Sequence, residues 1–311
     1  MVRKKVAITI RSFDINGPAM ELLKANCDIV YINTSGNRLN EPEVSRAIAG
    51  VHGVIAGTEP FSDKVIGSSD AIQVISRVGI GLDNIDTVFA EQKNVQICNT
   101  PLSPVQSVAE HTLALTLTLI KNIVNYSVSM RKCSHTPKPG ILLFGKNVGI
   151  IGLGRIGSRV ASLFDAFGCF IYYYDPFVPR PPVDSWHRID TIDQLVTMTE
   201  IVSIHVSARP DSPPLVDNAV ISRCKKGIIF INTSRGSLID ENALAVALES
   251  EIVAGAGLDV FSQEPYTGKL LSFPQVISTP HVASNTVESR REMEMEAVSN
   301  LLAAFNKMEK K

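Results

Sequence analysis

The stretch from Val148 to Asp175 constrains the fold more than any other part of the chain. It contains a short apolar run, a turn with three glycines, an amphipathic segment, a second apolar run and a terminal acid. A strand, a glycine-rich turn, a helix, a strand and an acid are typical of a dinucleotide-binding βαβ unit. A tight turn without a ligand is the alternative, but the agreement of all five parts favours an α/β domain that binds a dinucleotide.

Each glycine of the turn has a physical role. Gly152 makes the tight turn, Gly154 lets the backbone approach a pyrophosphate, and Gly157 lets the helix pack closely on the sheet. The helix N-terminus favours an anion because its N–H groups are unpaired and its dipole is positive there. Asp175 lies 18 residues beyond Gly157, close to the roughly 20 residues expected of an acid that binds a ribose 2′-hydroxyl. A carboxylate repels a 2′-phosphate, so the predicted cofactor is NAD rather than NADP.

Length and charge limit the classes of partner. At 311 residues the chain is long enough for two domains, and its formal net charge of −1 indicates no nucleic-acid or membrane partner. The longest apolar stretch, near Leu113–Ile120, falls short of the ~20 residues that span a bilayer. The five cysteines are odd in number and scattered. We therefore expect reduced thiols, a cytoplasmic location and no metal site.

Two series of short β-rich runs alternate with segments that suit helices. The first comprises Val6–Ile10, Asp28–Ile32, Gly53–Ala56, Ile72–Ser76 and Val95–Cys98; the second comprises Val148–Ile151, Cys169–Tyr174, Ile201–Val206, Gly227–Asn232, Val253–Val260 and Val276–Thr279. Alternation of this kind implies parallel pairing, so the first series predicts a small α/β domain and the second a doubly wound Rossmann sheet. One long helix is expected from a capping box at Ser107 and Glu110 to about Met130. A last helix, capped by Asn285, is expected to pack on the first domain.

Four polar residues lie just past the ends of predicted strands: Arg77, Arg235, Glu264 and His281. The C-terminal ends of parallel strands share one edge of the sheet, where ligands bind. His281 is the candidate general acid–base, because an ordinary imidazole titrates near pH ~6.5. Glu264 is the candidate to hold that imidazole in one tautomer, and Arg235 offers a fork for a substrate carboxylate.

These residues also have plainer interpretations. A single histidine after a strand is more often a surface or packing residue, and loop arginines and glutamates are usually solvated. Their shared edge favours the catalytic interpretation. Gly79 and Gly81 fit either a simple turn or a nest of N–H groups for a carboxylate. His111 and His205 are expected to serve packing or to line the crevice.

Six motifs occur along the chain in a specific order. They are Ser76–Asp86, Asn99–Pro101 with Ser107–His111, Val148–Gly157, Ile231–Gly236, Gly257–Val260 with Glu264–Pro265, and Thr279–His281. In this combination the chain resembles the D-isomer-specific 2-hydroxyacid dehydrogenases over nearly its whole length. The resemblance implies hydride transfer between a D-2-hydroxy acid and NAD.

The resemblance also implies roles for the site residues. Arg235 would bind the substrate carboxylate and carbonyl, Glu264 would pair with His281, and Asp259 would hold the nicotinamide carboxamide. Arg155 and Ile156 would contact the pyrophosphate, and Thr233, Ser234 and Arg235 would line the nicotinamide side. The amides of Val78 and Gly79, beside Arg77, would bind the substrate carboxylate. It further implies a smaller flavodoxin-like catalytic domain at 1–99 with 284–311, an NAD-binding domain at 100–283, and a homodimer formed through the latter.

Within the family, the loop Gly57–Pro60 and the sequence Ser76–Gly81 most resemble those of bacterial 3-phosphoglycerate dehydrogenases. The chain departs from these enzymes at Pro104, at Ser207–Arg209, and in a substrate loop without arginine. It also lacks the regulatory domain of longer members, so feedback by serine through that module is not expected. A glyoxylate or hydroxypyruvate reductase and a non-enzymatic NAD-sensing scaffold are the alternatives. Glu264 argues against a formate dehydrogenase, which carries an amide at that position.

Overall fold

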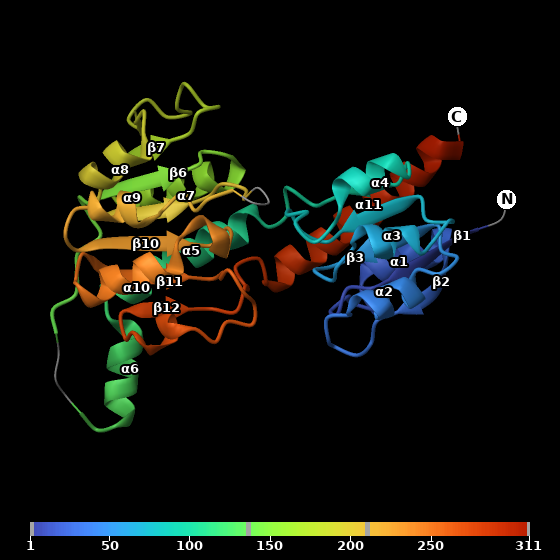
Figure 1. Ribbon diagram of the computed structural model, residues 1–311, viewed down its shortest axis with the longest axis horizontal. Coiled ribbons are helices and arrows are strands. Elements are labelled where there is room, and N and C mark those ends of the chain that lie inside the picture. The colour runs from blue at the N-terminus through green and yellow to red at the C-terminus, as the bar shows by residue number, and fades with distance from the viewer. Residues whose placement is uncertain (1–2, 135–137, 209–211, 310–311) are drawn as a thin grey trace. The chain divides into compact units, whose positions relative to one another are not determined.

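The computed structural model describes residues 3–134, 138–208 and 212–309. The chain divides into two compact units: unit 1 comprises Met1–Pro104 with Asn285–Lys311, and unit 2 comprises Val105–Ser284 (Figure 1). The division falls after Pro104, where the sequence predicted it after residue 99. The departure noted at Arg209 lies outside the described residues.

Unit 1 contains a five-stranded parallel sheet in the order β2-β1-β3-β4-β5. Its strands are β1 (Lys4–Ile8), β2 (Cys27–Ile32), β3 (Gly53–Ala56), β4 (Val74–Arg77) and β5 (Gln96–Cys98). This order is that of flavodoxin-like sheets. Each of the five predicted runs overlaps one of these strands, with ends that differ by up to two residues.

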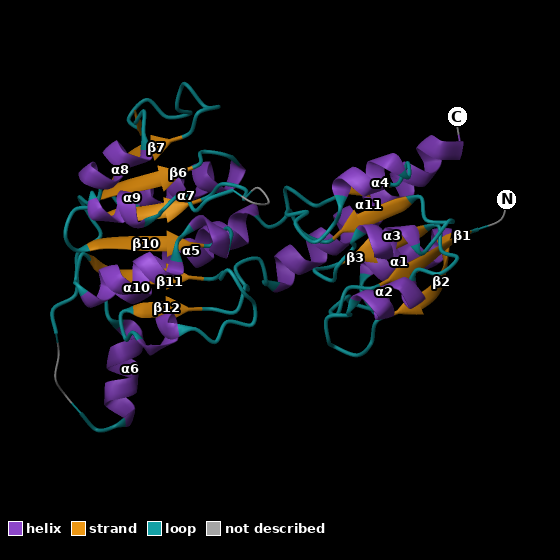
Figure 2. Cartoon of the chain, in the orientation of Figure 1, coloured by secondary structure: helices purple, strands orange, loops and turns teal. Residues whose placement is uncertain are grey.

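Helices cover both faces of this sheet (Figure 2). They are α1 (Pro18–Asn26), α2 (Glu41–Ala47), α3 (Asp63–Gly67), α4 (Thr87–Gln92) and α11 (Val287–Glu309). Val6 and Ile8 pack with α1 and α11, whereas Ala7 packs with α2, α3 and α4, because successive side chains of a strand point to opposite faces. The last helix packs on unit 1, as predicted. Its first turn is bonded by the hydroxyl of Thr286, which accepts from the Ser289 N–H at 3.2 Å, so the expected Asn285 cap is wrong.

Unit 2 contains a seven-stranded parallel sheet in the order β12-β11-β10-β9-β6-β7-β8. Its strands are β6 (Asn147–Ile151), β7 (Phe170–Tyr174), β8 (His187–Arg188), β9 (Ile201–Ile204), β10 (Ile228–Asn232), β11 (Val253–Leu258) and β12 (Val276–Ser278). The order reverses between β6 and β9, which is the switch point at which doubly wound sheets bind ligands. The two-residue edge strand β8 was not predicted, because it is too short for a periodic pattern.

The helices of unit 2 divide between the two faces of its sheet. They are α5 (Val105–Ile120), α6 (Ile123–Arg131), α7 (Arg155–Ala166), α8 (Ile192–Met198), α9 (Asn218–Ser222) and α10 (Glu241–Glu249), with short 3₁₀ turns at Gly236–Leu238 and Lys269–Ser272. Ile229 and Ile231 pack with α5 and α7, whereas Phe230 packs with α8, α9 and α10. The sheet is buried on both sides, as parallel sheets are. Nowhere in 3–134, 138–208 and 212–309 does a helix combine the length and the apolar character needed to cross a membrane.

The expected helix from Ser107 to Met130 is two helices. The chain leaves the helical conformation at Asn122, whose φ is +53°, a conformation that asparagine tolerates better than most residues. The capping box is also wrong: α5 begins at Val105, and the Ser107 hydroxyl donates to the Ala283 carbonyl at 2.7 Å. That bond ties α5 to the loop that carries His281.

Candidate active site

The glycine-rich turn between β6 and α7 leaves room for an anion at a helix N-terminus. Gly152 has a φ of +91°, and a Cβ on Gly157 would lie 1.9 Å from the Gly152 carbonyl oxygen. No atom lies within 4 Å of the position of a Cβ on Gly154. Gly154 is the N-cap of α7 and supplies no side-chain cap, so the amides of Arg155 and Ile156 are not covered from that position. A pyrophosphate fits this turn.

Asp175 follows β7 and lies beside the same turn. Its Oδ2 accepts from the Leu153 N–H at 2.8 Å, and its Oδ1 accepts from the Phe177 N–H at 2.8 Å. These bonds hold the carboxylate against the glycine-rich turn, where a bound adenosine ribose would offer its hydroxyls.

Arg235 belongs to a turn that is organised by Asn232, the last residue of β10. The Asn232 Oδ1 accepts from the Ser234 N–H at 3.0 Å, and its Nδ2 donates to the Arg235 carbonyl at 2.8 Å. A Cβ on Gly236 would lie 1.8 Å from the Phe261 carbonyl carbon. Only glycine permits this approach, which brings the Arg235 turn against the loop that carries Glu264.

Glu264 and His281 are hydrogen-bonded. The His281 Nδ1 lies 2.9 Å from the Glu264 Oε2, and the two side chains are 41% and 38% exposed. The other carboxylate oxygen accepts from the Phe261 N–H at 3.3 Å. Burial alone would raise the pKa of Glu264, but the hydrogen bond and charge of His281, the Phe261 N–H and the charge of Arg235 together lower it. Glu264 therefore interacts electrostatically with both of the other predicted catalytic residues.

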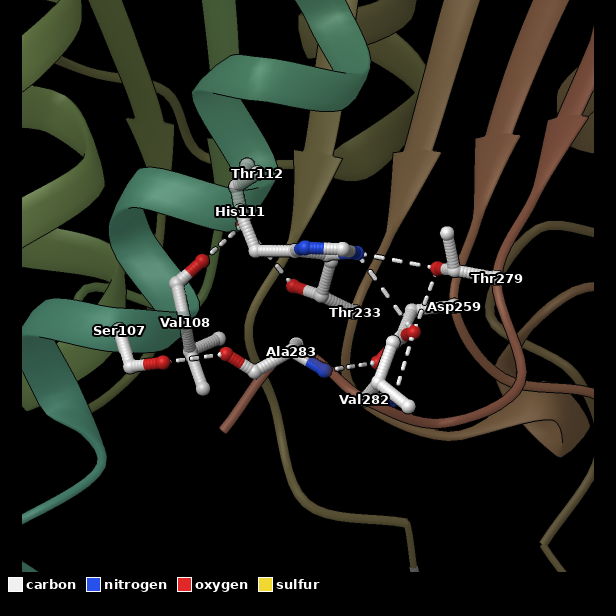
Figure 3. A network of polar contacts seen from close by, with 9 residues as sticks. All are labelled: Ser107, Val108, His111, Thr112, Thr233, Asp259, Thr279, Val282 and Ala283. Atoms are coloured by element: carbon white, nitrogen blue, oxygen red, sulfur yellow. Dashed lines mark hydrogen bonds and ion pairs between the residues drawn. The ribbon is translucent and has the colours of Figure 1, made fainter. Parts of the chain in front are cut away.

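Asp259 is fully buried and holds the His281 loop through both carboxylate oxygens (Figure 3). Its Oδ1 accepts from the Thr279 hydroxyl at 2.5 Å and from the Val282 N–H at 2.8 Å, and its Oδ2 accepts from the Ala283 N–H at 2.8 Å. A carboxylate has about four acceptor positions. Three of these positions are occupied and the side chain is 0% exposed, so the contact of Asp259 with a nicotinamide carboxamide stays a prediction.

The backbone of His281 is bonded to the same residue. Its N–H donates to the Asp259 carbonyl at 2.8 Å, and its φ is +53°. A non-glycine residue in this conformation is held there by its surroundings. The position of the imidazole thus depends on Asp259.

Sequence reasoning assigned no role to Thr279 or Asn232, and it expected His111 only to serve packing or to line the crevice. The His111 Nε2 lies 3.0 Å from the Thr279 Oγ1 and 3.6 Å from the Asp259 Oδ1. The sequence signal that could have found them is that all three lie in motifs that carry the family resemblance, Ser107–His111, Ile231–Gly236 and Thr279–His281. Thr233, one of the predicted cofactor contacts, is bonded at 3.0 Å to Thr112 on α5.

His205, directly after β9, suits the predicted packing role. Burial lowers the pKa of its imidazole to about 3, and its Nε2 lies 2.7 Å from the Ser203 hydroxyl. Its Cβ lies 3.4 Å from the position of a Cβ on Gly157. A neutral ring therefore packs beneath the glycine-rich turn.

The predicted carboxylate nest in unit 1 needs correction. The Val78 N–H donates to the Ala56 carbonyl at 2.8 Å, and the Gly79 N–H donates to the Thr100 hydroxyl at 2.7 Å. Both amides are thus used inside unit 1, because parallel pairing with β3 and the adjacent β5 loop supplies acceptors. Arg77 does lie beside them: a Cβ on Gly79 would meet its guanidinium at 1.7 Å.

No group of three or more histidine, cysteine, aspartate or glutamate side chains in the described ranges could hold a metal ion. The side chains of Arg235, Glu264 and His281 follow strands at this edge of unit 2, beside a turn that suits a dinucleotide.

Residues 113–283 match the family described as D-isomer specific 2-hydroxyacid dehydrogenase, NAD binding domain. The chain belongs to the D-isomer-specific 2-hydroxyacid dehydrogenase family. A hydroxypyruvate reductase of Thermotoga maritima is 34% identical over 278 residues, which cover 87% of this chain and 90% of that protein.

Other members of the family are similar over different shares of their length. A D-3-phosphoglycerate dehydrogenase of Mycobacterium tuberculosis is 37% identical over 233 residues, 73% of this chain and 44% of that protein. The chain thus matches less than half of that relative. The structure of an NADPH-dependent glyoxylate/hydroxypyruvate reductase from Sinorhizobium meliloti is similar with a TM-score of 0.85 and 29% identity, and the match covers 97% of this chain and 95% of that one.

The position of Asp175 predicts how a 2-hydroxyacid dehydrogenase of this sequence chooses its cofactor. Asp175→Asn keeps the size of the side chain but removes the charge that repels a 2′-phosphate. We expect the ratio of the Kd for NADPH to the Kd for NADH to fall about tenfold or more, the scale of one charge-assisted contact. Fluorescence titration with both nucleotides measures the ratio. The exposed Asp184→Asn is the control, and an unchanged ratio in Asp175→Asn would contradict the assignment.

Proposed function

We propose that this protein is an NAD-dependent oxidoreductase that transfers a hydride between a D-2-hydroxy acid and NAD. The observation that carries the proposal is the 2.9 Å pair of His281 and Glu264, whose carboxylate also lies within the electrostatic influence of Arg235. The pair follows strands of the sheet that contains the glycine-rich turn, and family membership supports NAD as the cofactor.

The pair determines which ring nitrogen faces the reaction. The lowered pKa keeps Glu264 ionised at neutral pH, so its oxygen accepts and the His281 Nδ1 carries the proton of the 2.9 Å bond. The Nε2 is then the atom that exchanges a proton with the substrate. In oxidation it takes the proton of the hydroxyl group, and in reduction it returns that proton to the carbonyl oxygen.

Arg235 supplies the positive charge that binds the carboxylate of the substrate. A guanidinium binds a carboxylate with two parallel hydrogen bonds, and the bonds of Asn232 to its turn fix its backbone. When bound, NAD accepts the hydride from the substrate carbon or gives it back. Holding the substrate in a fixed orientation lowers the barrier by several kcal/mol, on the order of what orientation contributes elsewhere.

For the acid itself we propose D-3-phosphoglycerate, on the basis of the 37% identity to the mycobacterial dehydrogenase. Hydroxypyruvate is the second candidate, and the 34% identity to the Thermotoga maritima hydroxypyruvate reductase, over 90% of that protein, favours it. Turnover of NADH with phosphohydroxypyruvate and with hydroxypyruvate separates the two: saturation with only the phosphorylated acid supports the first proposal and a place in serine biosynthesis.

The same assay separates an enzyme from an NAD-sensing scaffold. The scaffold predicts tight NADH binding with no oxidation of NADH in the presence of any 2-oxo acid. The cytoplasmic location expected from the cysteines stays a prediction, which fractionation of cells can test.

We further propose that unit 2 forms a homodimer. None of the residues of α6 is buried, and Ile123, Val128 and Met130 expose apolar side chains there. We propose that a second copy of the chain covers this surface, because the family resemblance implies a homodimer formed through the NAD-binding domain. Light scattering should give the mass of two chains, and Met130→Glu should reduce it to one; a monomeric wild-type protein would overturn this proposal.

Removing the acid–base group tests the enzymatic role. His281→Ala should lower kcat by about 10² or more, the usual scale of acid–base help. The Kd for NADH should change little, because the ring is not part of the glycine-rich turn. A stopped-flow measurement of NADH oxidation gives the first value and a fluorescence titration the second. Full turnover by His281→Ala would show that another group moves the proton.

Glu264 predicts a loss of rate when its charge is removed. Glu264→Gln keeps the shape of the side chain but replaces the ionised partner of the 2.9 Å bond to the His281 Nδ1. We expect kcat to fall about tenfold, the scale of one charge-assisted hydrogen bond to a catalytic group, with little change in the Kd for NADH. Steady-state assays give the first value and a fluorescence titration gives the second. A kcat equal to that of the wild type would contradict the coupling of the pair.

A further inference from the structure

His111 extends from α5 toward the loop that carries His281 (Figure 3). Its Nε2 lies 3.0 Å from the Thr279 Oγ1 and 3.6 Å from the Asp259 Oδ1. Its side chain is 23% exposed, whereas that of Asp259 is 0% exposed. The His111 ring therefore lies against the Thr279 hydroxyl and the Asp259 carboxylate, which are side-chain groups outside the His281–Glu264 pair.

The direction of each hydrogen bond follows from the donors present. Thr279 has one hydroxyl proton, and the 2.5 Å bond to the Asp259 Oδ1 uses it, because the carboxylate also accepts two backbone N–H groups. The Thr279 oxygen must then accept from His111. The His111 Nε2 therefore carries a proton, and the chain of donors runs from His111 through Thr279 to Asp259.

Asp259 transmits this arrangement to the residues on both sides of the catalytic ring. Its carboxylate holds the N–H groups of Val282 and Ala283, and its carbonyl accepts the His281 N–H at 2.8 Å. The Thr279 N–H is fixed in turn by the Leu258 carbonyl at 2.9 Å. A change in the donor at position 111 therefore alters the bonds of the segment in which His281 has its positive φ.

We propose that His111 is a positioning residue for His281 and acts through the Thr279 hydroxyl and the Asp259 carboxylate. This inference rests on the proposed dehydrogenase function for its effect on rate. The arrangement of hydrogen bonds on which it depends exists without turnover and is tested separately.

The first experiment reads the hydrogen bonds directly. Two-bond ¹H–¹⁵N correlation spectra of the ¹⁵N-labelled full chain, recorded near pH 8, report which ring nitrogen of each histidine carries a proton. We expect His111 in the Nε2–H form, with its Nε2 shift changed in Thr279→Val. An Nδ1–H form, or a shift that does not respond to Thr279→Val, would overturn the inference whether or not the protein turns over a hydroxy acid.

The second experiment reads the effect on catalysis. His111→Phe keeps an aromatic ring but removes the donor, and kcat should fall about tenfold, as expected when one hydrogen bond that orients a catalytic group is lost. The Kd for NADH and the KM for the acid should change by less than about threefold. His111→Gln should recover most of kcat because its amide nitrogen can donate to Thr279.

The control is Thr116→Val on the same helix. The hydroxyl of Thr116 is buried and donates to the Thr112 carbonyl within α5. We expect its kcat to equal that of the wild type. The double variant His111→Phe/Thr279→Val should be no slower than the slower single variant, because both break one chain of bonds. An unchanged kcat in His111→Phe, or an equal loss in His111→Gln, would overturn the inference. A wild-type protein without turnover would instead overturn the proposed function.

Discussion

The buried carboxylate of Asp259 is the interaction on which the candidate site depends. An ionisable group that is 0% exposed must be satisfied by hydrogen bonds, because removal from water otherwise costs several kcal/mol. Here the donors are the Thr279 hydroxyl and the N–H groups of Val282 and Ala283. These donors all belong to the segment after β12, so satisfying the carboxylate after β11 also fixes the loop of His281.

Close backbone approaches complete the arrangement. Gly236 meets the backbone of Phe261, and Gly157 meets that of Gly152. A methyl group at either glycine would collide with main-chain atoms, which move less readily than side chains. The first contact joins the Arg235 turn to the Glu264 loop, and the second brings the helix α7 against the turn where a pyrophosphate fits. Small residues therefore determine how near the catalytic and cofactor elements lie to one another.

Local patterns predicted much of this architecture. Apolar runs gave the strands because a parallel sheet is buried on both faces, and the glycine spacing predicted the turn before α7. The break at Asn122 was missed because asparagine takes both helical and left-handed conformations and the apolar period continues past it. Side chains after strand ends predicted Arg235, Glu264 and His281, since topology alone brings such positions to one edge.

Long-range contacts of single side chains could not be predicted in the same way. His111 lies on a helix with a continuous apolar pattern, so its spacing gave no sign that its ring meets Thr279. The Val78 and Gly79 amides have acceptors, Ala56 and Thr100, that lie 22 and 21 positions away in the sequence. Which partners a buried polar group finds depends on the packed fold, and periodicity carries no information about it.

Hydrogen exchange at single amides tests the central claim most directly. In the wild-type protein the N–H groups of Val282 and Ala283 should be strongly protected. In Asp259→Asn the amide has one oxygen in place of two, so the Ala283 N–H should lose its acceptor and exchange at least about tenfold faster. The amides of β10 and β11 should keep their protection, which shows that the unit is folded. Unchanged exchange at both Val282 and Ala283 would contradict the claim that the Asp259 carboxylate holds the loop of His281.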